Sequence, residues 1–111
     1  MSPSRLASLA TGAAVLAFLR VPGFAADSRD ADKGLAYAER VCSDCHNVLR
    51  TDAASPNPQA PAFKKIANTP GMSITALTVW SRTSHPTMPN LVIEPEDMQD
   101  LIAYILSLRN R

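Results

Sequence analysis

The sequence lacks any concentration of positive charge. Its 111 residues include 11 lysines and arginines against 10 aspartates and glutamates, and the longest basic run is Lys64-Lys65. Nucleic-acid-binding domains carry a basic patch or stripe, so nucleic acid is not an expected partner. The sequence also lacks internal repeats and the alternating apolar pattern of β-strands, which favours an all-α fold.

Cysteine and histidine are scarce, with two of each in the chain. Cys42 and Cys45 lie so close together that a disulfide between them would close a very small loop and add little stability. A zinc site would need two further ligands, and only His46 and His85 could supply nitrogen. A thioredoxin-like dithiol would need strands around it, and none is predicted. These features weigh against three common uses of a cysteine pair.

The N-terminus has the parts of a secretory signal peptide. Arg5 supplies a positive charge, residues 6–19 form a nearly uncharged apolar run of 14 residues, and small residues follow. The run is too short to span a bilayer comfortably, although an uncleaved anchor is the alternative. We predict a signal peptide at residues 1–25, cleaved after Ala25, and export to the periplasm.

Cleavage at this site would leave residues 26–111, a single small domain of 86 residues. Arg5 and Arg20 would be lost with the signal peptide, so nine basic and ten acidic residues would remain and the net charge would be −1. A domain of this size buries a modest core and often depends on a disulfide, a metal or a cofactor.

Most of the first half of this domain is predicted to be loop. Residues 27–32 are polar and form a loose N-terminus, and residues 33–41 have helical composition. Residues 47–61 contain three prolines, each of which disfavours helix at the residue before it. A loop of this length in a small domain usually wraps around something. A short helical turn is predicted at residues 62–67.

The second half holds two predicted helices. The first covers residues 74–83 and could be capped by Ser73 or Thr75. The second begins at Pro95, where proline suits the first helical position and two acidic residues face the positive end of the helix dipole. Its apolar residues recur at helical spacing, and this stripe consists of Met98, Leu101, Ile102, Ile105 and Leu106.

The C-x-x-C-H string at Cys42, Cys45 and His46 is the motif in the sequence that indicates a specific chemistry. Two thiols at this spacing can add to the two vinyl groups of one haem edge, and the histidine that follows is then held under the iron. The string is specific in an exported chain with no other cysteine. It predicts one covalently attached haem c, and a disulfide or redox dithiol is the alternative.

Four side chains of the mature chain could supply the second axial ligand of the iron. Met98 belongs to the apolar stripe, so it is expected in the core, and Met72 could pack in a loop or beside the haem. Met88 lies at the centre of Pro-Thr-Met-Pro-Asn, a rigid extended segment, 42 residues after His46. His85, in the same loop, is the competing ligand; otherwise it could cap the preceding helix or bond a haem propionate.

Four segments, in this order, resemble a small bacterial class I c-type cytochrome: GLAYAERVCSDCH, APAF, SHPTMPN and EDMQDLIAYILSLR. Together they cover nearly all of the mature chain. The resemblance implies a cytochrome c fold of three to four helices around one haem, in which the N- and C-terminal helices cross closely. Gly34 would permit this crossing, and Tyr37 and Tyr104 would supply aromatic packing there.

The same resemblance assigns roles in the site. Cys42 and Cys45 would hold the haem through two thioether bonds. His46 and Met88 would be the axial ligands of the iron. Both roles are carried over from the family to the matching positions of this sequence.

The resemblance also implies side chains that support the site. The second ring nitrogen of His46 would bond a proline carbonyl, which we assign to Pro61 with Pro58 as the alternative. Trp80 departs from the family pattern, because it does not lie where longer members carry a propionate-binding tryptophan. We expect it instead to pack against the haem edge from the third helix, and Arg82 is a candidate propionate partner.

The expected function is one-electron transfer without catalysis. Expected donors are a dehydrogenase or a quinol-oxidising complex, and expected acceptors are an oxidase or a reductase. The carrier itself is expected to be a monomer with no membrane span after the signal peptide is cleaved. The main alternative is a haem protein that binds a small ligand or reacts with peroxide because its methionine ligand is labile or missing. A further alternative is a dedicated electron-transfer subunit of a periplasmic dehydrogenase.

Overall fold

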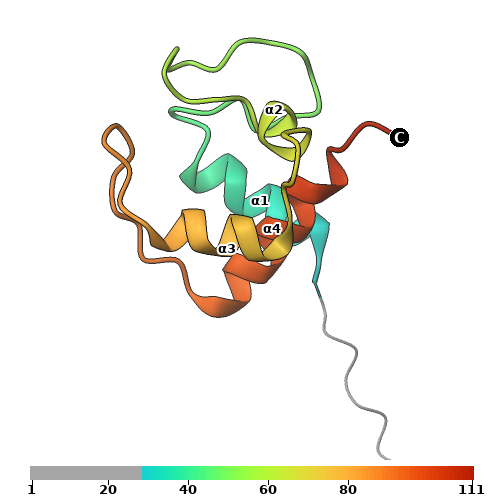
Figure 1. Cartoon of the computed structure of the whole chain (residues 1–111), viewed down its shortest axis with the longest axis vertical. Coiled ribbons are helices and arrows are strands. Elements are labelled where there is room, and N and C mark those ends of the chain that lie inside the picture. The colour runs from blue at the N-terminus through green and yellow to red at the C-terminus, as the bar shows by residue number, and fades with distance from the viewer. Residues whose placement is uncertain (1–28) are drawn as a thin grey trace, which may run out of the picture.

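Four helices and no β-strand make up the part of the chain that the structure describes, residues 29–111 of a computed structural model. The helices are α1 (Ala31–Val41), α2 (Phe63–Ala67), α3 (Ile74–Arg82) and α4 (Pro95–Ser107) (Figure 1). The prediction of an all-α fold is confirmed. None of these four helices is long and apolar enough to cross a membrane. The predicted signal peptide, residues 1–25, lies outside the described residues.

α1 begins two residues earlier than the sequence predicted, because Asp30 caps it. The Asp30 carboxylate accepts hydrogen bonds from the backbone N–H groups of Asp32 at 3.0 Å and Lys33 at 3.2 Å. These bonds satisfy two N–H groups that a helix N-terminus leaves unpaired. The N–H of Asp30 donates to Oδ1 of the buried Asp100 at 2.7 Å. This last bond joins the start of α1 to the middle of α4.

α1 and α4 cross in direct contact at Gly34 (Figure 1). A β-carbon at Gly34 would lie 2.6 Å from the carbonyl carbon of Asp100 and 2.7 Å from Cβ of Tyr104. Non-bonded carbon atoms do not approach this closely, so the crossing requires glycine, as the family resemblance implied. Tyr104 is buried, and the half-buried Tyr37 of α1 packs against the same core.

The hydrophobic core is centred on α4. Four of the five residues of the predicted apolar stripe are buried, and the fifth, Leu106, is half-buried against them. Every other helix adds to the same core: Ala38 from α1, Phe63 and Ala67 from α2, and Leu77 from α3. Removing this apolar surface from water is the main contribution that stabilises the arrangement of the four helices.

Side chains from two connections bind the C-terminal end of α4. Arg50 donates to the carbonyl of Ser107 at 2.6 Å, and Nδ2 of Asn68 donates to the carbonyl of Leu108 at 3.2 Å. The last carbonyls of a helix have no partner within it, so these bonds satisfy acceptors that would otherwise need water. They also attach the long loop after α1 and the α2–α3 connection to α4.

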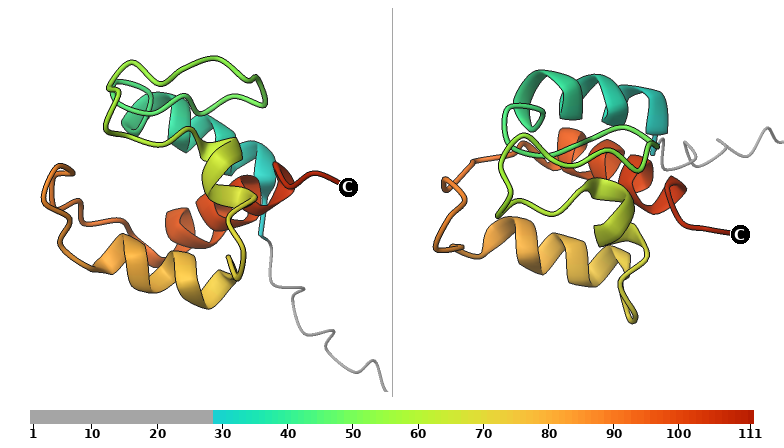
Figure 2. Two further views of the ribbon diagram at one scale, coloured as in Figure 1. Left: turned by 45° about the horizontal axis from the view of Figure 1, so that its top comes forward. Right: turned by 90° about the horizontal axis from the view of Figure 1, so that it is seen from above.

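The segment between α3 and α4, residues 83–94, is called the Met88 loop below. α3 leads into it from an N-cap at Ser73, whose hydroxyl accepts from the N–H of Ala76 at 3.1 Å, so Ser73 rather than Thr75 is the cap. Both views of Figure 2 show the Met88 loop, in orange, on the same side of the molecule as the turn that follows α1. The fold therefore brings the two segments with predicted site residues to one side.

Candidate functional site

The C-x-x-C-H segment forms a tight turn at the end of α1. The N–H of Cys42 donates to the carbonyl of Ala38 at 2.8 Å and so continues the helical pattern. The N–H groups of Cys45 and His46 both donate to the carbonyl of Cys42, at 3.2 and 2.9 Å. This turn gathers both thiols and the imidazole at one end of α1.

Both cysteines have free thiols. Cys42 is buried and Cys45 is half-buried. Burial raises the pKa of the Cys42 thiol to about 11, so this thiol is protonated at neutral pH. Because the thiolate is the reactive form in disulfide exchange, the structure does not favour the redox-dithiol interpretation.

The ring of His46 is held in one orientation by two contacts. Its Nδ1 lies 2.7 Å from the carbonyl oxygen of Pro61, and its ring centroid lies 5.3 Å from that of Phe63. A carbonyl oxygen only accepts, so Nδ1 must carry the proton in this hydrogen bond. Nε2 of a neutral imidazole then has its lone pair available for a metal. The bond goes to Pro61, our first choice in the sequence, rather than to Pro58.

The loop that presents this carbonyl is organised by Asn47, which sequence analysis missed. Nδ2 of the buried Asn47 donates to the carbonyl of Ala53 at 2.8 Å and to Oγ1 of Thr51 at 3.1 Å. Its Oδ1 accepts from the N–H of Leu49 at 3.1 Å, and its backbone carbonyl accepts from the N–H of Phe63 at 2.9 Å. The one signal in the sequence is an asparagine that can bond the N–H two residues on, an Asx turn.

A buried hydrogen bond ties α4 to the same segment. The hydroxyl of Tyr104 donates to the carbonyl of Val48 at 2.6 Å, two residues after His46. Burial raises the pKa of the Tyr104 phenol, so the hydroxyl keeps the proton that it donates. The bond adds a positioning role to the aromatic packing that the resemblance implied.

Loss of this bond should be measurable in the stability of the haem-loaded protein. We expect Tyr104→Phe to lower the free energy of unfolding in denaturant by about 1–3 kcal/mol, because the carbonyl of Val48 would be left buried without a donor. Tyr37→Phe is the matched control, since the hydroxyl of Tyr37 has no hydrogen-bond partner within residues 29–111. Equal losses in the two variants would show that the Val48 bond contributes nothing specific.

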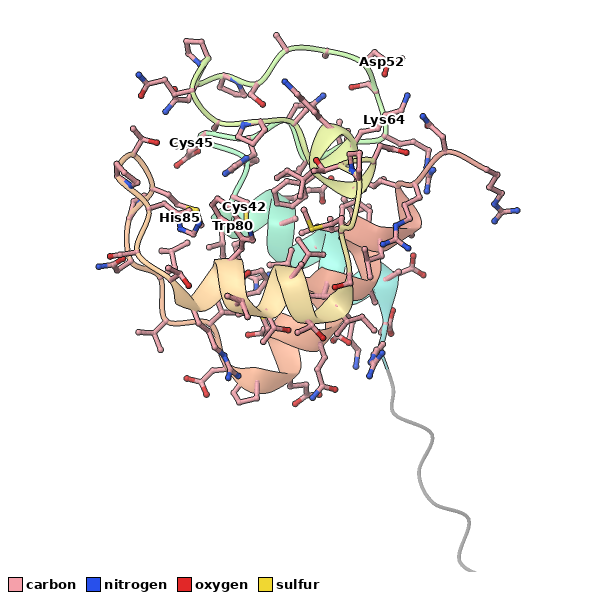
Figure 3. All side chains as sticks on the ribbon, in the orientation of Figure 1. Cys42, Cys45, Asp52, Lys64, Trp80 and His85 are labelled. Carbon is pink, nitrogen blue, oxygen red and sulfur yellow. The ribbon has the colours of Figure 1, made fainter. Side chains whose placement is uncertain are left out.

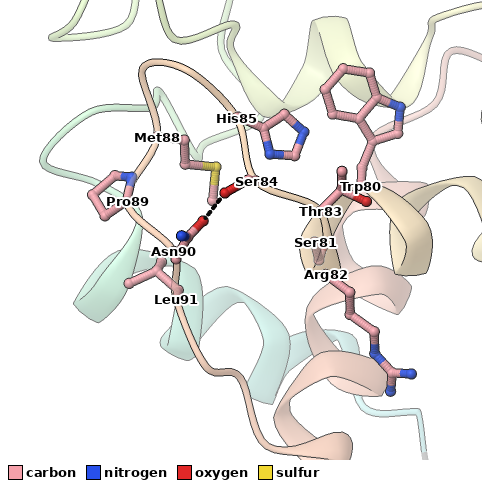
Figure 4. Close-up of a pocket in the computed structure, with 10 residues that line it drawn as sticks. All are labelled: Trp80, Ser81, Arg82, Thr83, Ser84, His85, Met88, Pro89, Asn90 and Leu91. Atoms are coloured by element: carbon pink, nitrogen blue, oxygen red, sulfur yellow. Dashed lines mark hydrogen bonds between the residues drawn. The ribbon is translucent and has the colours of Figure 1, made fainter.

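The Met88 loop and the end of α3 line a pocket of about 360 Å³ (Figure 4). Its walls come from residues 80–85 and 88–91, so two of the four candidate second ligands, His85 and Met88, lie in it. Met88 is half-buried, and its N–H donates to the carbonyl of His85 at 3.3 Å. The other two candidate ligands, Met72 and Met98, do not line this pocket.

Met98 is buried in the core on α4, as the sequence predicted. Met72 is half-buried and packs against the edge of that core, and its carbonyl accepts a hydrogen bond from Arg109. Neither side chain lines the pocket of the Met88 loop. Within the described residues, Met88 is therefore the methionine best placed to act as a ligand from this loop.

Trp80 and His85 form one wall of the pocket as a stacked pair. Their ring centroids lie 4.3 Å apart with an interplanar angle of 22°. Figure 3 draws both side chains on the side of the molecule that also carries Cys42 and Cys45. Trp80 is 58% exposed, so the apolar surface of its indole is available at this site. That surface suits the predicted packing of Trp80 against a haem, and Arg82 also lines the pocket.

The donor set fits a haem better than a bare metal ion. No group of three or more His, Cys, Asp or Glu side chains that could hold an ion is present among residues 29–111. A haem already supplies four nitrogen ligands to its iron and needs only axial donors from the protein. The chain offers such a cofactor one imidazole with an available Nε2, one thioether and two free thiols, and the exposed indole of Trp80 adds apolar surface beside them.

The all-α fold and these side chains fit a haem-binding protein. The family model for cytochrome c matches residues 31–109, which include all four helices and the whole of the site. The chain therefore belongs to the cytochrome c family, whose members bind haem c covalently, and the predicted family and cofactor are confirmed. The chain has no match among curated proteins or among solved structures.

Proposed function

We propose that the protein is a periplasmic monohaem cytochrome c that carries single electrons between redox proteins and is not an enzyme. Residues 1–25 are its signal peptide, and residues 26–111 are the exported domain. Cys42 and Cys45 bind the haem through thioether bonds. Nε2 of His46 and Sδ of Met88 are the axial ligands of the iron.

The observation that carries this proposal is the hydrogen bond between Nδ1 of His46 and the carbonyl of Pro61, at 2.7 Å. It fixes the tautomer in which Nε2 is the metal-binding nitrogen, and it increases the basicity of the imidazole. A histidine with no metal-binding role would not have to be held in this tautomer and orientation. Here it belongs to a side chain that directly follows two free thiols.

Met88 is favoured over His85 as the second ligand for a reason of geometry. The ring of His85 is stacked on Trp80 at 4.3 Å, which gives it a packing role that involves no metal, whereas Met88 is half-buried in the pocket and its thioether has no partner among residues 29–111. Two prolines limit the conformations of the loop: Pro89 directly follows Met88, and Pro86 lies two residues before it.

A haem with two protein ligands supplies reversible one-electron chemistry at iron, and thioether ligation favours the reduced state. The residues of this chain contribute by occupying both axial positions, which leaves no coordination site for a substrate. Met88 is half-buried and the indole of Trp80 is exposed, so apolar groups line the pocket beside polar ones. These properties suit electron transfer and disfavour catalysis.

The proposed partners are a donor dehydrogenase or quinol-oxidising complex and an acceptor oxidase or reductase, which the carrier meets as a monomer. The exported domain has a net charge of −1, so transfer rates should depend only modestly on ionic strength. Encounters of this kind use small interfaces.

Carbon monoxide binding separates this function from a haem protein that binds small ligands. We expect the reduced, haem-loaded protein not to bind carbon monoxide at neutral pH, because Met88 holds the sixth position. Met88→Ala should bind it readily, which provides the positive control. Rapid binding by the unmodified protein would contradict the carrier function and favour the ligand-binding alternative. Absorption spectra before and after addition of the gas are sufficient.

A further inference from the structure

One hydrogen bond between side chains closes the base of the Met88 loop. The hydroxyl of Ser84 donates to Oδ1 of Asn90 at 2.8 Å and joins residues six positions apart (Figure 4). Inside the ring that this bond closes, the N–H of Met88 donates to the carbonyl of His85 at 3.3 Å. Within residues 83–94, Ser84 and Asn90 form the only hydrogen bond between two side chains.

The ring from Ser84 to Asn90 has little conformational freedom left. Pro86 and Pro89 lie inside it, and each fixes its own φ angle. Moving Met88 away from the pocket would therefore require the two ends of the ring to separate. The Ser84–Asn90 hydrogen bond opposes that separation and offsets part of the conformational entropy that an open loop would gain.

We propose that Ser84 and Asn90 are positioning residues for Met88: their hydrogen bond slows the opening of the loop and so slows the replacement of Met88 at the iron by an external ligand. This inference rests on the proposed function, in which Met88 is the second axial ligand. The two residues act through the loop and do not themselves touch the iron.

The expected effect is local, because of where the pair lies. Ser84 and Asn90 are both exposed and contribute nothing to the core on α4. Breaking their bond should change the opening of this loop far more than the unfolding of the whole domain, since segments of a protein open with different free energies. Thr87 lies in the same loop, is also exposed, and has no hydrogen-bond partner within the described residues.

The test is the rate at which imidazole replaces Met88 in the oxidised, haem-loaded protein, followed by absorbance. We expect Ser84→Ala and Asn90→Ala each to raise this rate by about 3- to 10-fold, the range that one neutral hydrogen bond gives. The double variant should be no faster than the single variants, because both remove the same bond. Ser84→Thr keeps the hydroxyl, so it should react at the rate of the unmodified protein, and Thr87→Ala should react at that rate too.

Each outcome decides the proposal. It is overturned if both alanine variants react at the original rate, or if Thr87→Ala accelerates the reaction equally. It is also overturned if the thermal unfolding midpoint falls in proportion to the rate change, since the role would then be structural. Failure of the proposed function gives a different result. A bond between methionine sulfur and iron(III) produces a weak absorption band at long wavelength, and this band would then be missing before any substitution in the Ser84–Asn90 pair.

Discussion

Replacing Cys42 and Cys45 together with serine is expected to give a protein from which acidified organic solvent extracts all haem. In the unmodified protein the haem should stay with the denatured chain, because thioether bonds survive the treatment. The chain has no other cysteine, so no second route to covalent attachment exists. Intact mass measurement should find the polypeptide plus one haem for the unmodified protein and the polypeptide alone for the double variant.

The same double variant should lose much of its folded population. Without the thioether bonds the haem can dissociate, and the contacts that it makes inside the fold are then lost, which matters because a domain this small has a small core. Asp44→Ala is the matched control, since Asp44 is exposed in the same turn and lies between the two thiols. Covalent haem in the double variant, or loss of haem from Asp44→Ala, would contradict the assignment of the cysteines.

Gly34→Ala is expected to produce a large loss of stability. The added β-carbon would meet the carbonyl group of Asp100 and Cβ of Tyr104, both within 2.7 Å. The Asp100 carbonyl belongs to α4 and cannot move without disturbing that helix. We expect a loss of about 3 kcal/mol in the free energy of unfolding, out of a total of about 5–15 kcal/mol.

Gly71→Ala is the control for this substitution, because the chemical change is the same and nothing lies within 4 Å of the added atom. Its φ of +78° is unfavourable for alanine, so a cost of about 1–2 kcal/mol is expected from the backbone alone. Denaturant unfolding of both haem-loaded variants compares the two costs. A Gly34→Ala protein that is no less stable than Gly71→Ala would mean that α1 and α4 do not cross as closely as described.

The elements of this fold could be predicted because their signals are local. Pro95 followed by two acidic residues marks the start of α4, and the apolar stripe marks its buried face, so both were found. The C-x-x-C-H string predicts its cofactor in the same way. The start of α1 was placed two residues late because a capping aspartate, Asp30, was taken for part of a loose terminus.

Contacts between distant segments could not be predicted in this way. The bond between Asp30 and Asp100 joins residues 70 positions apart, and Asp100 interrupts an otherwise apolar face. The bond between Tyr104 and Val48 spans 56 positions. The residues flanking these side chains in the sequence do not indicate either bond. The crossing of the helices decides which carbonyl or amide group each side chain contacts. The carbonyl of Pro61 was anticipated only through the family resemblance.

These distant contacts explain how a small chain positions the site. Asp100 holds the start of α1, Tyr104 holds the segment after His46, and both project from α4. Arg50 attaches the long loop to the end of the same helix. The orientation of His46 therefore depends on α4, although no residue of that helix is a proposed ligand.

The absorption spectrum of the oxidised, haem-loaded protein tests the central claim most directly, which is axial ligation by His46 and Met88. A bond between methionine sulfur and iron(III) produces a weak band at long wavelength. We predict that this band is present at neutral pH, disappears in Met88→Ala and persists in Met72→Ala. A spectrum without the band, or a band lost in Met72→Ala instead, would contradict the account.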